Sequence, residues 1–269
     1  MKRLLGFITF LSFLSFIFFV SCEKESNVDS TIGLLAYYPF NGDIKDYSKN
    51  QNHGMDSTKG VYVSGIKGLA HDFNGKTDFI TLKNTIDFSK GLTFSFWIKS
   101  RGFLNGENNG CIISKYSMSG RRSFFVNSYG YQSQVSKNEI RAFFFPEGFT
   151  TDGQEWVGSN TTKAEIAQLS FNPDLWSTVE PTALILNSWT HCVVNCTETN
   201  IEIWLNGKIT CSKHREHSLF FDSKEEPVII GNILHGGEGK NNHFNGSLDE
   251  LRIYNRSLTK EEILILCQH

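Results

Sequence analysis

Short runs of apolar residues, some of them alternating with polar residues, recur between residues 34 and 254 and are separated by Gly, Asn, Asp and Ser. Residues 92–99, LTFSFWIK, alternate cleanly, which predicts a strand with one buried face because successive side chains of a strand point to opposite sides. Residues 189–195 and 201–205 flank the polar segment CTETN and predict a hairpin. The remaining runs are 34–40, 79–82, 111–114, 123–127, 140–145, 228–231 and 248–254. Many short strands without sustained helical periodicity predict an all-β sandwich of two sheets.

Two segments depart from this pattern. At the C-terminal end, Thr259 is followed three residues later by Glu262, a capping-box spacing that predicts a short helix. Residues 147–187 have weak periodicity and several turn signals, and irregular stretches of that length are often functional. This stretch contains Trp156 and Trp176, which we take as speculative ligand-binding residues because exposed tryptophans stack on sugars and anchor partner proteins. They could equally pack the segment onto the sandwich.

The first 30 residues contain features that predict where in the cell the protein is located. Lys2 and Arg3 precede an uncharged, mostly apolar run over residues 4–20, and FVSC at residues 19–22 resembles a bacterial lipoprotein box. That resemblance implies a signal peptide over residues 1–21, cleavage before Cys22, and acylation of Cys22 with palmitate-type chains. Phe19 departs from the usual Leu, and an ordinary signal peptide or an uncleaved anchor is the alternative. Residues 22–30 are polar and acidic, which is typical of a tether.

Composition excludes some functional classes. The chain of 269 residues has a net charge of -2 and 20% charged residues, whereas a nucleic-acid-binding protein normally carries a basic excess. Six cysteines are too few for a disulfide-dense miniprotein. Five remain beyond Cys22, an odd number that cannot all pair internally. We expect buried free thiols, although Cys192 and Cys211 flank the predicted hairpin and could be cross-strand neighbours.

Five sequence blocks resemble a known family when they are taken in order. They are LLAYYPFNGDIKDYSKNQNHG (34–54), HDFNGKTDFITL (71–82), LTFSFWIKS (92–100), NSWTHCVVNCTETNIEIWLNGK (187–208) and NGSLDELRIYNRSLTKEEI (245–263). This order is similar to that of laminin-G-like bacterial domains of the concanavalin A-like lectin/glucanase superfamily. The resemblance implies a jelly-roll sandwich of two antiparallel sheets over residues 31–269, with residues 147–187 as a long insertion.

The resemblance also implies a possible metal. Relatives of this family often hold a structural calcium between the loop after the first strand and the last strand. Transferred to this chain, the ligands are Asp249 and Asp46, with Asp43 on the same loop and the backbone near residues 74–75 as a further contributor. Carboxylate and carbonyl oxygens suit Ca²⁺, but Asn, Gly and Asp also form turns without any ion, and both interpretations stay open.

No catalytic motif accompanies this fold. Glucanases of the superfamily place two carboxylates on one face of a strand as E-x-D-x-E or E-x-D-x-x-E, and neither pattern occurs in this sequence. We therefore expect a non-catalytic, lipid-anchored binding module of the bacterial cell envelope, located at the outer membrane, with either the periplasmic or the extracellular face left open. The carbohydrate ligand rests on the analogy of fold alone. The alternatives are a protein-interaction or adhesion module and, less favoured, a divergent glycoside hydrolase.

Overall fold

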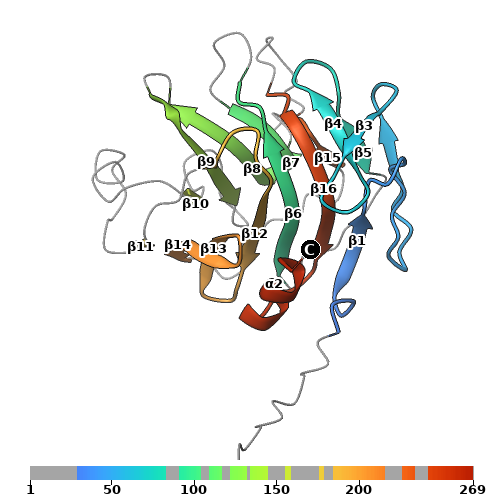
Figure 1. Cartoon of the computed structure of the whole chain (residues 1–269). Helices are drawn as coiled ribbons and strands as arrows, with labels where there is room; N and C mark the ends of the chain where they lie inside the picture. The colour runs from blue at the N-terminus through green and yellow to red at the C-terminus, as the bar shows by residue number, and fades with distance from the viewer. Residues whose placement is uncertain are drawn as a thin grey trace, which may run out of the picture.

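Two antiparallel sheets stack face to face in the computed structural model, which describes residues 29–82, 91–103, 109–116, 122–131, 134–144, 155–158, 176–178, 184–215, 226–233 and 242–268. Figure 1 shows the sheets as two layers, with the helix α2 (Lys260–Leu266) at one end of the larger sheet. The predicted jelly-roll sandwich with a short C-terminal helix is confirmed. None of the helices in the described ranges is long and apolar enough to cross a membrane. The predicted signal peptide over residues 1–21 and the predicted acylation site Cys22 lie outside the described residues.

The larger sheet has the strand order β11-β14-β13-β12-β6-β16-β4-β3, and β1 also pairs with β16. Its strands are β1 (Leu34–Tyr38), β3 (Val61–Ser64), β4 (Leu69–Asn74), β6 (Leu92–Ser100), β11 (Trp176–Thr178), β12 (Thr190–Cys196), β13 (Asn200–Leu205), β14 (Lys208–His214) and β16 (Asn245–Tyr254). The smaller sheet has the order β10-β9-β8-β7-β15-β5-β2. Its strands are β2 (Gly54–Asp56), β5 (Ile80–Leu82), β7 (Asn109–Tyr116), β8 (Arg122–Tyr131), β9 (Gln134–Phe144), β10 (Glu155–Gly158) and β15 (Val228–Ile230).

The main core lies between the sheets. Alternate residues of β6 and β16 on one side meet alternate residues of β8 and β9 on the other, for example Phe94 against Phe124 with ring centroids 4.9 Å apart. The predicted hairpin is present as β12 and β13, and Cys192 pairs in register with Leu205. Burial of this apolar face is what stabilises the sandwich, because neither sheet can exclude water from its inner side alone.

The strand predicted to have one buried face is buried on both. In β6 every residue from Leu92 to Ile98 is buried. The polar face is covered because the chain after β16 returns across it: the Thr93 hydroxyl donates to the carbonyl oxygen of Arg256 at 2.7 Å and to the side-chain oxygen of Asn195 at 2.8 Å. Sequence alternation marked the two faces correctly, but it carried no information about what packs on the outer one.

The segment expected to be irregular, residues 147–187, contributes two short strands. β10 pairs with β9 and β11 pairs with β14, so each strand extends the edge of a different sheet. The cysteines in the described ranges are free thiols: Cys111, Cys192, Cys196 and Cys211 are buried, and Cys267 is partly buried. Cys211 on β14 pairs in register with Ile203 on β13, and it is not a cross-strand neighbour of Cys192 because β13 lies between β14 and β12.

Candidate functional site

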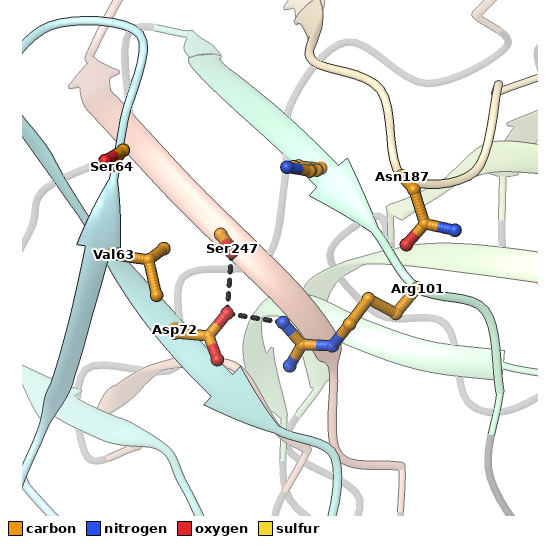
Figure 2. Close-up of a pocket in the computed structure, with 7 residues that line it drawn as sticks. Val63, Ser64, Asp72, Arg101, Asn187 and Ser247 are labelled. Carbon is orange, nitrogen blue, oxygen red and sulfur yellow. Dashed lines mark hydrogen bonds and ion pairs between the residues drawn. The ribbon is translucent and has the colours of Figure 1, made fainter.

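A pocket with a volume of about 380 Å³ opens on the outer face of the larger sheet. It lies at the end of β6 that carries Lys99, about 20 Å along the strand from Thr93 at a rise of about 3.3 Å per residue. Figure 2 shows polar side chains converging on it from three neighbouring strands and from the chain that follows β6. The lining residues are Val63, Ser64, Asp72, Lys99, Arg101, Asn187 and Ser247. Six of these seven side chains are polar, which suits a ligand that carries many hydroxyl groups or charges.

One wall of the pocket is a fixed ion pair. The guanidinium of Arg101 donates to Asp72 Oδ1 at 2.5 Å, to the Asn245 side-chain oxygen at 3.0 Å, and to the carbonyl oxygen of Phe73 at 2.6 Å. The Ser247 hydroxyl donates to the same Asp72 oxygen at 2.6 Å, and Figure 2 shows both contacts of Asp72. Because Arg101 is bonded to two different strands, its planar head cannot rotate away. The wall is therefore held in place before any ligand arrives.

The other polar groups of the pocket are not used by the protein itself. Within the described ranges, Asp72 Oδ2, the Lys99 ammonium, the Asn187 side-chain amide and the Ser64 hydroxyl have no hydrogen-bond partner. The backbone of Asn187 is nevertheless fixed beside the pocket, because its N–H donates to the carbonyl oxygen of Ser100 at 2.8 Å. The pocket thus offers one carboxylate acceptor, one cation and two neutral groups, which can bind neighbouring hydroxyls of one ligand.

Of the predicted metal ligands, Asp46 has its oxygens fully occupied. Its carboxylate is 3% exposed and accepts backbone N–H groups from Tyr37 at 2.8 Å, Ser48 at 2.7 Å and Asn52 at 2.7 Å, together with the Ser48 hydroxyl at 2.8 Å. These bonds fold the loop after β1 around the side chain, as an Asx turn does. Asp43, on the same loop, lies near the Lys45 ammonium at 3.5 Å.

Asp249, the second principal metal ligand in the prediction, forms hydrogen bonds with a different loop, the turn between β3 and β4. Its Oδ2 accepts the backbone N–H groups of Ile66 at 2.8 Å and Lys67 at 3.1 Å, and its Oδ1 accepts that of Glu250 at 2.8 Å. Removal from water raises the pKa of Asp249 to about 6, and the backbone N–H groups oppose this shift without cancelling it. The side chain ties the turn between β3 and β4 to β16.

The residues present do not fit a calcium ion shared by Asp46 and Asp249. The atoms that contact both carboxylates are N–H and O–H donors, whereas Ca²⁺ needs six to eight oxygen ligands. No group of three or more His, Cys, Asp and Glu residues that could hold a metal occurs in the part of the chain that the structure describes. Calcium binding stays a prediction, and a metal measurement decides it.

The two speculative ligand-binding tryptophans lie on different sheets. Trp156 pairs in register with Phe143 on β9, and Trp176 pairs with Lys213 on β14. Both strands lie near β14, because β10 is in contact with β14 and β11 pairs with it. The assignment of these tryptophans to a ligand-binding site stays a prediction.

The outer face of the smaller sheet carries a second group of aromatic residues. Phe125 and Phe143 stack with centroids 4.3 Å apart, and Tyr116 meets the edge of Phe125 at 5.6 Å. Glu139 on this face is buried and forms an ion pair with Arg141. A glycoside hydrolase needs two carboxylates about 5–10 Å apart, and the described side chains on this face of β8 and β9 include only this one, which is neutralised.

Sequence reasoning did not identify the pocket residues, although a signal existed. Four of the five family-like blocks each supply one polar lining residue: Asp72, Lys99, Asn187 and Ser247. In each block this residue lies near one end, beside the apolar positions that form the core. A polar position repeated at the ends of several strands would have pointed to a common surface, if the strand order had been known.

Comparison with known proteins is consistent with this architecture. A sequence model of the concanavalin A-like lectin/glucanases superfamily matches residues 74–264. No match to a curated protein was found.

Solved structures show the same fold at low sequence identity. Domain 4 of AbnA, a GH43 extracellular arabinanase from Geobacillus stearothermophilus, in complex with arabinotriose, is 18% identical with a TM-score of 0.59, covering 87% of this chain and 98% of that one. The binding domain of Paraclostridial Mosquitocidal Protein 1 is 17% identical with a TM-score of 0.63, covering 88% and 52%. The binding domain of botulinum neurotoxin DC in complex with SialylT is 10% identical with a TM-score of 0.62, covering 88% and 51%.

The chain spans nearly all of the arabinanase domain and about half of the toxin binding domains. At these identities the likeness shows the fold alone. The sequence model, in contrast, covers well over half of the chain and includes β6 and β16, two of the strands that line the pocket. The chain therefore belongs to the concanavalin A-like lectin/glucanases superfamily.

Proposed function

We propose that this protein is a non-catalytic carbohydrate-binding module that is held on the bacterial cell envelope by acylation of Cys22. The observation that carries the binding proposal is the pocket of Figure 2, in which a preformed Asp72–Arg101 wall faces side chains that the protein leaves unbonded. Sugars are bound through several hydrogen bonds to adjacent hydroxyls, and a rigid set of donors and acceptors loses little entropy on binding. The solved neighbours include a domain in complex with arabinotriose, which supports the choice of ligand class.

The chemistry of the pocket supports binding rather than hydrolysis. Asp72 is its only carboxylate among the lining residues, and Arg101 and Ser247 both bond to one of its oxygens. Glycoside hydrolysis needs a second carboxyl group to act as nucleophile or base. Asp72 can accept a sugar hydroxyl through Oδ2, which makes it a binding group in this pocket.

The binding proposal is tested with the purified protein on an array of neutral and acidic polysaccharides, followed by titration calorimetry on those that bind. We expect saturable binding and no release of reducing ends over hours of incubation. Asp72→Asn and Asn187→Ala should each weaken binding at least tenfold, while Asn50→Ala, on the loop after β1, should leave it unchanged. Failure of every polysaccharide to bind contradicts the proposal and favours the alternative of a protein-interaction module.

The anchor is tested separately. Cys22→Ala should abolish incorporation of labelled palmitate and release the protein from the membrane fraction, because stable anchoring needs two or more acyl chains on the cysteine. Cys267→Ala, which alters a partly buried thiol of the folded domain, is the matched control and should retain the label. Normal cleavage with unchanged membrane association in Cys22→Ala contradicts the anchor proposal.

A further inference from the structure

The charges that line the pocket do not balance. Asp72 and Arg101 form an ion pair and neutralise each other. Lys99 is half-buried on β6 and forms no ion pair with any residue in the described ranges. The pocket therefore carries one excess positive charge, although the chain as a whole has a net charge of -2.

Among the residues that the structure describes, the carboxylates nearest to Lys99 are already bonded to other groups. Asp249, near it on the neighbouring strand β16, is fully buried and accepts three backbone N–H groups. Asp72 already accepts two hydrogen bonds on Oδ1. A partly desolvated ammonium without a partner favours the binding of an anion, because the ion pair recovers part of the lost hydration energy.

Neutral donors lie beside this charge. The Asn187 amide has no partner in the described part of the chain, and its backbone is bonded to Ser100 at the end of the same strand as Lys99. An ammonium and an amide N–H together can bind the two oxygens of one carboxylate. Asp72 Oδ2 remains on the other wall of the pocket to accept a hydroxyl from the same ligand.

We propose that this pocket selects an anionic sugar residue, with its carboxylate or sulfate group on Lys99 and Asn187 and a ring hydroxyl on Asp72. This inference rests on the proposed carbohydrate-binding function and names its ligand class. It assigns Lys99 as the residue that distinguishes acidic from neutral glycans. Arg101 keeps a structural role, because its guanidinium is already bonded to Asp72, Asn245 and Phe73.

The test uses glycans in matched pairs that differ only in charge. The pairs are polygalacturonate with its methyl ester, hyaluronate with its carboxyl-reduced form, and dextran sulfate with dextran, and binding to the full chain is measured by calorimetry at two salt concentrations. We expect the charged member of at least one pair to bind ten times more tightly than its neutral partner, and this preference to decrease with salt. The first two pairs test recognition of a carboxylate group, and the third pair tests recognition of a sulfate group.

Variants show whether Lys99 causes the preference. Lys99→Gln should reduce binding of the acidic glycan to the level of the neutral one, and Lys99→Arg should retain the preference. Lys208→Gln removes an exposed lysine of the same sheet and should change nothing. Thermal unfolding of each variant confirms that the domain is folded.

Each outcome decides between the two proposals. Equal binding of charged and neutral partners, preference for neutral glycans, or an unchanged preference in Lys99→Gln overturns the anionic assignment but leaves carbohydrate binding intact. Binding to none of the charged or neutral glycans rejects both.

Discussion

The outer face of the larger sheet is closed at one end and open at the other. At the Thr93 end of β6, helix α2 and the chain leading to it cover the sheet, and the residues in contact are apolar: Val193, Trp204, Tyr254, Leu258, Ile263 and Leu266. At the Lys99 end the same face carries the polar pocket. Figure 1 shows α2 near the lower end of β6, while Figure 2 shows the uncovered side chains.

The covered end is held in place by side-chain hydrogen bonds that take the place of backbone pairing. The Asn195 side chain accepts from the backbone N–H of Leu258 at 2.9 Å and donates to its carbonyl oxygen at 3.1 Å. Thr259 and Glu262 form the capping box, and Arg256 donates to both oxygens of Glu262. These side-chain hydrogen bonds satisfy the polar groups of Asn195, Thr259 and Glu262 at the edge of the contact, so their burial carries no penalty for unpaired donors or acceptors.

The difference shows how one sheet face serves two purposes. Where the outer side chains are apolar, or are polar like Thr93 and Asn195 and bond to the returning chain, the chain covers them and gains stability from the apolar burial. Where they are polar and partly unpaired, they are left for a ligand. Substitutions at the covered end should therefore change stability and spare binding, and substitutions at the open end should do the reverse.

The largest effect is expected for Ile263→Ala. Ile263 is fully buried between α2 and the sheet, and removal of a buried Ile side chain to Ala costs about 2–5 kcal/mol of unfolding free energy. Ile265→Ala is the matched control, since Ile265 is 37% exposed on the same helix, and it should cost about 1 kcal/mol or less. Denaturant titration measures both, and equal losses would show that the helix face is not the source of the stability.

The second effect concerns pH and Asp249, which lies between the two ends and pairs in register with Trp97. Its pKa is raised from 3.8 to about 6, so between these values the folded state binds more protons than the unfolded state. This group therefore favours folding at pH 4 and loses its contribution as the pH rises through 6, by at most about 3 kcal/mol. Asp249→Asn should remove that slope in unfolding experiments from pH 4 to 7. A parallel pH profile for both proteins, or an NMR titration with a pKa near 4, contradicts the prediction.

At the open end, Arg101→Met should affect binding more than folding. The change breaks the Asp72 wall, so the affinity for any bound glycan should fall at least tenfold, which is about 1.4 kcal/mol. Arg101 is 35% exposed in its side chain, so the loss in unfolding free energy should be only about 1 kcal/mol. Calorimetry and denaturant titration on the same sample compare the two values. A larger loss in folding than in binding would erase the distinction between the two ends.

The smallest effect is expected from metal removal. The carboxylates of Asp46 and Asp249 are surrounded by N–H donors, so excess EDTA should shift the melting temperature by less than about 1 °C, since only a ligand of the folded state stabilises it. Added Ca²⁺ should likewise have little effect. A fall with EDTA that Ca²⁺ reverses, and Mg²⁺ does not, would restore the calcium site predicted from the family resemblance.

Local patterns in the sequence determined the elements. Alternation over residues 92–99 predicted β6, the flanked segment at residues 196–200 predicted the β12–β13 hairpin, and the spacing of Thr259 and Glu262 predicted the helix start. These features depend on neighbours within a few residues, because strand alternation and helix capping are set by backbone geometry at that range. The order of the five blocks also identified the fold.

Only the tertiary structure decided which residues form the site. Asp72, Lys99, Asn187 and Ser247 meet because β4, β16 and β6 lie side by side and Asn187 bonds to the end of β6, an arrangement that no local pattern contains. Trp156 and Trp176 were predicted together, yet the structure places them on different sheets. The family resemblance predicts an ion shared by Asp46 and Asp249. In the structure Asp46 accepts backbone amides from β1 and its own loop, and Asp249 accepts those of Glu250 and of the turn between β3 and β4. Strand pairing joins residues more than 100 positions apart, so the partners of a polar side chain are fixed by register and burial, which the sequence specifies only through the whole fold.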